Sequence, residues 1–247
     1  MTGVMAVANA PPVNCAGPDL NTGVKSPLLR KMTYSFKEIF LTLQGEGAQS
    51  GRVAVFARFA GCNLWSGRER DRKGALCDFC DTDFVGIDGE NGGKFQSASD
   101  VLAALNKVWG DIDPSRKMVV FTGGEPLLQL DKPLIDKLKS DGFYIAIETN
   151  GTILAPDDID WICVSPKGNN ALVQTFGHEL KLIWPQKGID PSQFEKLAFQ
   201  NYYLQPMDGL NDNGLLRADN TQIVIDYCLS HPKWAMSTQT HKIVGLK

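Results

Sequence analysis

The feature that most constrains the fold is a repeated pattern, in which a short apolar run is followed at once by polar residues and then by a helix-like stretch. The runs that carry this pattern are 118–121, 143–147, 161–164, 202–204 and 234–236. Short apolar runs bounded by turn residues are typical of buried strands, and strands that alternate with helices pair in parallel. In barrel enzymes, polar residues just after such strands carry the chemistry. We therefore predict an α/β fold, an open, partial parallel β/α barrel of about six strands, too few for a closed eight-stranded barrel.

Two more strands and a helix precede the repeat. Residues 32–43 and 53–59 alternate apolar and polar side chains, and the glycine-rich segment 44–47 lies between them. This pattern predicts two strands joined by a turn. The segment 97–109 places apolar residues at helical spacing and begins with a Ser-x-x-Asp sequence that resembles a capping box, so it predicts an amphipathic helix.

The composition indicates one folded domain behind an extension. Hydrophobic residues make up 43% of the 247, which is ample for one core. Residues 1–31 contain four prolines and no periodicity, so we expect a disordered N-terminal extension and a single domain over 32–247. A net charge of -3 without blocks of like charge argues against nucleic-acid and membrane-surface partners. No apolar stretch has the length of a membrane span, and no signal peptide is recognisable, so we expect a cytoplasmic protein.

Three of the six cysteines cluster in the loop after the strand 53–59. Fourteen residues separate Cys62 from Cys77, and two separate Cys77 from Cys80. A structural zinc site normally has four ligands, and a fourth is missing here. An iron–sulfur cluster held by three cysteines would keep one iron open for chemistry. The spacing alone leaves both metals open, while Cys163 lies in an apolar run where free cysteine behaves as a small buried hydrophobe.

The residues around these cysteines resemble the radical S-adenosylmethionine superfamily, in which a three-cysteine loop follows one strand and Gly-Gly-Glu follows the next. The long first cysteine gap further resembles the 7-carboxy-7-deazaguanine synthase family. The motifs that carry this resemblance are Phe40-Leu-Thr-Leu-Gln-Gly-Glu-Gly47, Gly61-Cys-Asn-Leu-Trp65, Cys77-Asp-Phe-Cys-Asp-Thr-Asp83, Thr122-Gly-Gly-Glu125, Glu148-Thr-Asn-Gly-Thr152, Ser165-Pro-Lys167, Gln205-Pro-Met-Asp208 and Thr240-His-Lys242. The resemblance covers essentially residues 32–247.

The resemblance implies a radical ring contraction of 6-carboxy-5,6,7,8-tetrahydropterin to 7-carboxy-7-deazaguanine with loss of ammonia, catalysed by a carbon–nitrogen lyase. This reaction lies on the route to 7-deazapurine bases such as queuosine. The implied cofactors are a 4Fe-4S cluster, S-adenosyl-L-methionine and Mg2+, and the implied partners are the small pterin substrate, a second copy in a homodimer and a reducing protein such as flavodoxin. Two alternatives remain, a glycyl-radical-enzyme activase and a zinc-stabilised pterin-binding module.

The resemblance also assigns roles to residues, with the radical chemistry carried by the cofactor and by no catalytic side chain. Cys62, Cys77 and Cys80 are the cluster ligands, and Thr82 is the magnesium ligand. The residues expected at S-adenosylmethionine are Phe79, Asp81, Gly124, Glu148, Ser165, Lys167, Gln205, Pro206, Met207 and Asp208. The residues expected at the substrate are Leu43, Gln44, Gly45, Arg58, Thr122, His241 and Lys247.

Two of the substrate residues carry more specific expectations. Arg58 sits inside an apolar strand, where an unpaired charge is costly, so its partner is either the substrate carboxylate or an internal acid such as Glu46 or an aspartate. In the family the chain terminus reaches the substrate, which implies that the main-chain carboxylate of Lys247 binds the pterin. The Lys247 side chain would then have to point away from the pocket.

Overall fold

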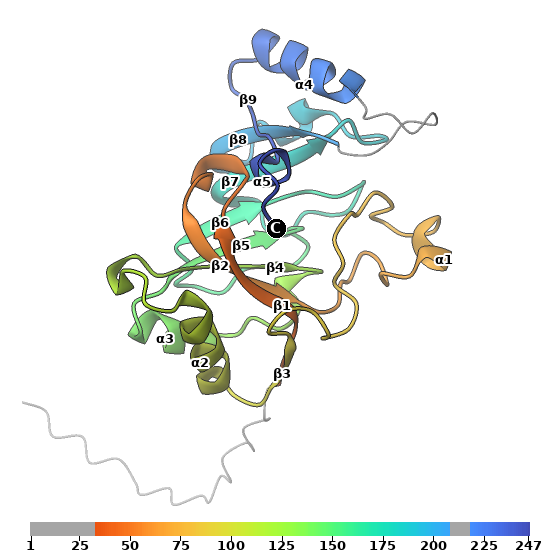
Figure 1. The fold of residues 1–247 in the computed structure, drawn as a ribbon. Helices are drawn as coiled ribbons and strands as arrows, with labels where there is room; N and C mark the ends of the chain where they lie inside the picture. The colour runs from red at the N-terminus through yellow and green to blue at the C-terminus, as the bar shows by residue number, and fades with distance from the viewer. Residues whose placement is uncertain (1–32, 208–217) are drawn as a thin grey trace, which may run out of the picture. The chain divides into compact units, whose positions relative to one another are not determined.

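The computed structural model describes residues 33–207 and 218–247, which form one nine-stranded sheet with helices (Figure 1). The strands are β1 Tyr34–Leu43, β2 Val53–Phe59, β3 Gly93–Phe95, β4 Met118–Gly123, β5 Tyr144–Thr149, β6 Trp161–Val164, β7 Phe176–Trp184, β8 Ala198–Pro206 and β9 Ala235–Met236. The α-helices are α1 Glu69–Arg72, α2 Ala98–Trp109, α3 Lys132–Ser140, α4 Ala218–Ser230 and α5 Thr240–Ile243. The predicted extension 1–31 and Asp208 lie outside the described residues.

The sheet is open and mostly parallel, as predicted. Its strand order is β3-β1-β2-β4-β5-β6-β7-β8-β9, and all neighbours from β2 to β9 pair in parallel. Strands β1 and β3 add an antiparallel edge, and the sheet does not close. The predicted count of about six strands is low because β3 and β7 escaped recognition. Strand β3 has only three residues, and the first part of β7 interleaves charged and polar with apolar side chains before its short apolar end.

Helices α2 and α3 cover one face of the sheet and build the main core against it. Leu105 and Leu134, one from each helix, are fully buried in this core. Between the strands, Phe59 stacks on Phe36 with ring centroids 4.2 Å apart. The predicted helix and its cap are confirmed, because the Ser97 hydroxyl accepts a hydrogen bond from a backbone amide in the first turn of α2.

The opposite face of the sheet carries the polar side chains. Side chains alternate between faces along a strand, so the burial of Ala57 and Phe59 under the helices directs Arg58 to the other side. A small apolar floor of Ala54, Met118, Val120 and Ala146 occupies this second face. The polar residues of β2, β4, β5, β7 and β8 follow closer to the strands' carboxyl ends. The sheet therefore gathers polar groups where a parallel α/β fold places its chemistry.

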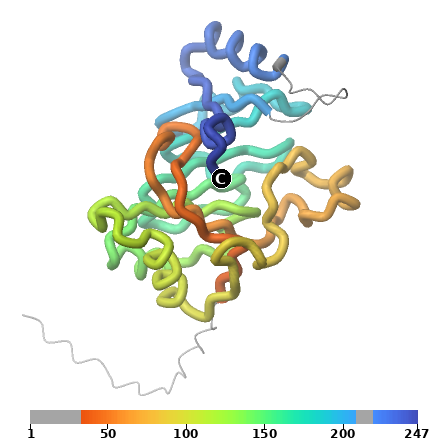
Figure 2. Tube along the Cα trace, in the orientation of Figure 1, coloured from red at the N-terminus to blue at the C-terminus, as the bar shows by residue number. Residues whose placement is uncertain are grey.

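The end of the chain returns to the start of the sheet. The Thr240 amide at the beginning of α5 donates to the Gly45 carbonyl, 3.0 Å away, and the Thr42 hydroxyl donates to the main-chain oxygen of Lys247 at 2.9 Å. Figures 1 and 2 show α5 beside the turn that follows β1. Among the described helices, none combines the length and apolar character that a membrane span requires.

Candidate functional site

A cavity of about 340 Å³ opens on the polar face of the sheet, within the size range of small-molecule sites. Most of the predicted site residues line it, from β1, β2, the cysteine loop, the strand ends and the chain end. They are Leu43, Gln44, Arg58, Cys62, Cys77, Phe79, Cys80, Asp81, Thr82, Thr122, Gly124, Glu148, Ser165, Lys167, Gln205, Pro206, His241 and Lys247. Met207 borders a neighbouring hollow, and Gly45 lies behind His241, where a Cβ atom would stand 2.2 Å from the imidazole Nδ1.

The three predicted cluster ligands border the same cavity. Cys77 is buried, and Cys62 and Cys80 are partly exposed. A hydrogen bond with Cys77 lowers the pKa of Cys80 to about 6, and the same bond, with burial, raises the pKa of Cys77. The hydrogen bond therefore favours the thiolate form of Cys80, which is the form that binds metals.

The donor chemistry of these residues fits an iron–sulfur cluster. Cysteine thiolates are the usual ligands of such clusters, and three of them leave one iron of a cubane open. Cys62, Cys77 and Cys80 all line one cavity wall. Among residues 33–207 and 218–247, no three His, Cys, Asp or Glu side chains are arranged around a single-ion site in this structure.

The Gly-Gly-Glu motif contacts the start of the cysteine loop. A Cβ atom on Gly124 would lie 1.9 Å from the Gly61 carbonyl oxygen and 2.9 Å from the Cβ of Cys62. The Glu125 amide donates to the same Gly61 carbonyl at 2.9 Å. The buried Glu125 carboxylate accepts hydrogen bonds from Leu127, Thr149 and Asn150. This motif therefore fixes the start of the loop to the ends of β4 and β5.

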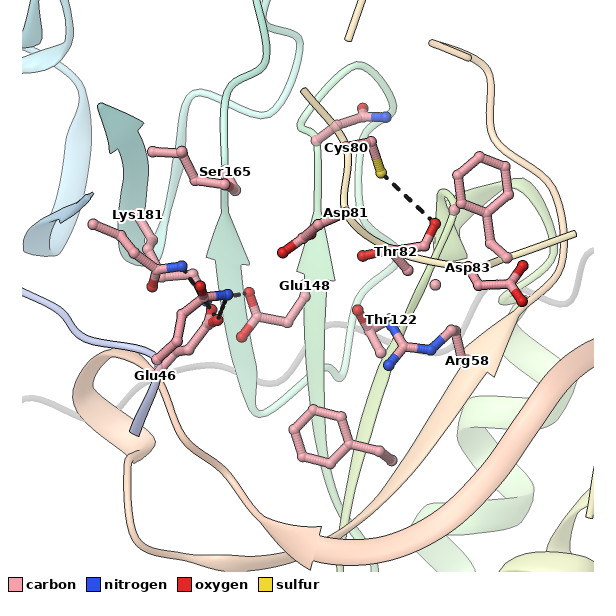
Figure 3. A pocket seen from close by; sticks show the side chains of 18 of the residues that line it. Glu46, Arg58, Cys80, Asp81, Thr82, Asp83, Thr122, Glu148, Ser165 and Lys181 are labelled. Atoms are coloured by element: carbon pink, nitrogen blue, oxygen red, sulfur yellow. Dashed lines mark hydrogen bonds and ion pairs between the residues drawn. The ribbon is translucent and has the colours of Figure 1, made fainter. Parts of the chain in front are cut away.

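The sequence analysis did not identify Lys181, a buried lysine on β7 that lines the cavity. The Lys181 side chain is 4% exposed, and its ammonium contacts Glu46 at 2.6 Å and Glu148 at 2.8 Å (Figure 3). Burial acts to raise the pKa of Glu46, but the charge and hydrogen bond of Lys181, together with a hydrogen bond from Gln239, lower it to about 2. Gln44 also donates to Glu148, at 3.1 Å. Both carboxylates are therefore acceptors held in place by one cation.

A signal for this lysine is present in the sequence. The stretch Glu179-Leu-Lys-Leu182 alternates charged and apolar residues, which is typical of a strand with two different faces. In the structure Leu180 and Leu182 join the helix-covered core, and Glu179 and Lys181 are buried on the other side.

Arg58 has an internal partner that differs from both internal acids expected. Its Nε donates to Glu38 Oε1 at 2.9 Å, and the two residues are direct cross-strand partners on β1 and β2. The internal alternative, a pair with Glu46 or an aspartate, is wrong, because Glu46 contacts Lys181; the contact with a substrate carboxylate stays a prediction. Arg58 still lines the cavity, and Thr122 is its register partner on β4 (Figure 3).

The remaining predicted residues form local pairs around the cavity. Lys167 donates to the Ser165 hydroxyl at 2.6 Å and lies 5.8 Å from the ring centre of Phe79. Asp81, beside the cysteines, contacts the Lys242 ammonium of α5 at 2.8 Å. The cysteine loop and the chain end are thus linked across the cavity.

The Lys247 side chain was expected to point away from the pocket, and it does not. The Lys247 ammonium lies 2.7 Å from Glu38 Oε2 and 4.6 Å from the ring centre of Phe40, and both of these residues line the cavity. The side chain therefore packs along the cavity wall, whereas the sequence argument required it to point away. Burial lowers the pKa of the nearby His241, which favours its neutral imidazole.

Comparisons with known proteins show the family to which the chain belongs. The 7-carboxy-7-deazaguanine synthase of Caulobacter vibrioides is 60% identical over 215 residues, which cover 87% of this chain and all of the relative. The chain belongs to the 7-carboxy-7-deazaguanine synthase family. The synthase of Bordetella pertussis is 57% identical with the same coverage. The crystal structure of QueE from Escherichia coli matches with a TM-score of 0.60 and 26% identity, over 85% of this chain and 95% of that one.

Membership in the synthase family decides between the functional expectations. No family model matches the chain, so the assignment rests on these relatives. The chain is an enzyme, and the comparisons support the synthase expectation over the activase and the zinc-stabilised module.

Proposed function

We propose that this enzyme converts 6-carboxy-5,6,7,8-tetrahydropterin to 7-carboxy-7-deazaguanine with loss of ammonia, as a radical S-adenosylmethionine carbon–nitrogen lyase in queuosine-precursor biosynthesis. The observation that carries the proposal is one cavity whose wall joins the three-cysteine loop to the polar ends of the parallel strands. Cluster, cofactor and pterin would meet there. A volume of about 340 Å³ is compatible with small ligands.

Cys62, Cys77 and Cys80 would hold the 4Fe-4S cluster. When bound, the reduced cluster supplies the electron that cleaves S-adenosylmethionine and so generates the hydrogen-abstracting radical. The protein's part is to orient the ligands. Lys167, paired with Ser165 near the Phe79 ring, places a cation and an aromatic face beside the cysteines, which suits a carboxylate and an adenine.

The pterin would lie over the floor formed by Lys181. The carboxylates of Glu46 and Glu148 both accept from Lys181 there, and Gln44 donates to Glu148. The guanidine-like edge of a pterin offers planar N–H donors, which carboxylates accept well. Arg58 at the other side of the cavity offers donors to the substrate carboxylate.

Thr82 would be the single side-chain ligand of Mg2+, beside the cluster loop. Magnesium keeps several waters and takes few protein ligands, so one hydroxyl together with substrate oxygens suffices. Replacing Thr82 by alanine should lower turnover and weaken its dependence on magnesium, with unchanged iron content. Thr82→Ser keeps the hydroxyl and should retain the dependence. An unchanged magnesium response in Thr82→Ala would remove this residue from the site.

The proposal extends to a homodimer and a reducing partner such as flavodoxin, which rest on the family resemblance, and to a cytoplasmic location, which rests on the sequence pattern. Sedimentation of the purified protein tests the dimer, and turnover with reduced flavodoxin in place of a chemical reductant tests the electron donor.

The function itself is tested by anaerobic incubation of cluster-loaded protein with reductant, S-adenosylmethionine, Mg2+ and 6-carboxy-5,6,7,8-tetrahydropterin. Mass analysis should detect 7-carboxy-7-deazaguanine and released ammonia. Cys77→Ala is the control and should yield neither. A fully loaded cluster that cleaves S-adenosylmethionine and leaves the pterin unchanged would refute the proposal.

A further inference from the structure

The last residue, Lys247, belongs to a group of three charged side chains that line the cavity, with Glu38 and Arg58. Glu38 lies between two cations, and each cation occupies a different carboxylate oxygen. Arg58 Nε donates to Oε1 at 2.9 Å, while the Lys247 ammonium lies 2.7 Å from Oε2. The side chains of Glu38 and Arg58 are 14% and 20% exposed, so this pairing is partly shielded from solvent.

This sharing leaves Arg58 with unused donors. A guanidinium carries five N–H groups in a planar fork and pairs best with a carboxylate through two parallel bonds. Within the described residues, Arg58 donates to protein only through Nε. Its terminal nitrogens remain available to an anion in the cavity that Arg58 lines.

The position of Lys247 prevents a second hydrogen bond between Arg58 and Glu38. If its ammonium were absent, Glu38 Oε2 would lack this partner and could accept a second bond from Arg58. A two-bond pair would satisfy the carboxylate and engage a terminal guanidinium nitrogen, so fewer donors would remain for a ligand. The Thr42 hydroxyl holds the main-chain oxygen of Lys247 at 2.9 Å, which anchors the residue beside Glu38.

We propose that Lys247 is a positioning residue for substrate specificity: by occupying Glu38 Oε2, its side chain reserves the terminal donors of Arg58 for a carboxylate on the ligand. This role rests on the proposed synthase function and is separate from any role of the main-chain carboxylate at the terminus. It predicts that the side chain matters for pterins that carry a 6-carboxylate and has no effect on pterins that lack one.

The test compares two probes, 6-carboxypterin and unsubstituted pterin, as competitors of turnover. Lys247→Met removes the charge and keeps the length of the side chain. We expect about fivefold weaker inhibition by 6-carboxypterin and a similar rise in KM, equivalent to ~1 kcal/mol at 1.4 kcal/mol per tenfold. Inhibition by pterin and the iron content should stay at wild-type values. Lys247→Arg should restore the preference, and Lys107→Met on the exposed side of α2 is the matched charge control.

A double variant tests whether Lys247 acts through Glu38. In a Glu38→Gln background the further change Lys247→Met should add nothing, because the carboxylate that it controls is gone. Equal losses for both probes, or no loss for 6-carboxypterin, in an active enzyme would overturn the inference alone. A wild-type protein that binds neither probe and forms no product would overturn the synthase proposal and this inference together.

Discussion

Removal of the buried ammonium of Lys181 is the perturbation with the largest expected effect on stability. In Lys181→Met the carboxylates of Glu46 and Glu148 lose the cation that contacts them at 2.6 and 2.8 Å. The methionine is of similar length and apolar, so the variant removes charge with little change in volume. Breaking a buried ion pair on one side is strongly destabilising, because the remaining charge keeps its desolvation cost.

The magnitude follows from the pKa of Glu46. Burial opposes the shift, and Lys181 makes the largest contribution to lowering this pKa from an ordinary 4.5 to about 2. At 1.36 kcal/mol per pH unit, the difference corresponds to about 3 kcal/mol of stability. For a domain of this size, ~1 kcal/mol changes the Tm by ~2–4 °C, so we expect the Tm of Lys181→Met to fall by ~6–12 °C at pH 7.

The lowered pKa of Glu46 also sets the direction in which stability changes with pH. A carboxyl whose folded pKa is depressed stabilises the protein above its unfolded pKa, here about 4.5, and this stability is lost as the pH falls toward 2. The Tm difference between wild type and Lys181→Met should therefore be largest at pH 7 and shrink by pH 3. The double variant Glu46→Gln with Lys181→Met should lower the Tm less than Lys181→Met alone, because it removes one of the two buried carboxylates that lose their cation.

Thermal unfolding followed by circular dichroism measures these differences, on cluster-free protein so that loss of the cluster does not contribute. The exposed Lys107→Met serves as the control and should leave the Tm within about 1 °C. A Tm of Lys181→Met within 2 °C of wild type at pH 7, or a difference that grows on acidification, would refute the electrostatic reasoning.

Three further variants test the cysteine loop and the chain end. Cys77→Ala should lose the cluster and all cleavage of S-adenosylmethionine, whereas Cys163→Ala should keep both; iron and sulfide analysis with the reverse outcome would overturn the ligand assignment. Gly124→Ala should lower cluster occupancy several-fold, because its Cβ would lie 1.9 Å from a carbonyl oxygen of the loop, and an occupancy equal to wild type would show that the loop yields easily. A few residues added after Lys247 should raise KM with normal cluster loading, and His241→Ala should do so more mildly; wild-type kinetics in the extended protein would exclude the terminus from the substrate site.

The sequence by itself determined the sheet's class and the place of most site residues. Apolar runs are local signals for parallel strands, and the carboxyl ends of parallel strands meet at one edge whatever their exact register. The polar residues after each run, such as Glu148 and Ser165, were therefore predictable as neighbours of the cysteine loop, and both line the cavity. The motif resemblance then identified the family to which the relatives also point.

Only the tertiary structure decided how the charges pair. Whether Arg58 meets Glu38, Glu46 or a substrate depends on the register between β1 and β2. The alternation pattern excludes a slip of one residue, but a shift of two residues keeps every side chain on its face and changes the partner. The Lys181 contacts need β7 beside β6 and the turn after β1 folded over it, so residues 135 positions apart in the chain become partners at 2.6 Å. Lys247 reaches Glu38 because the chain end returns to β1. Such pairings arise from long-range packing and burial, which set the cost of leaving each charge alone.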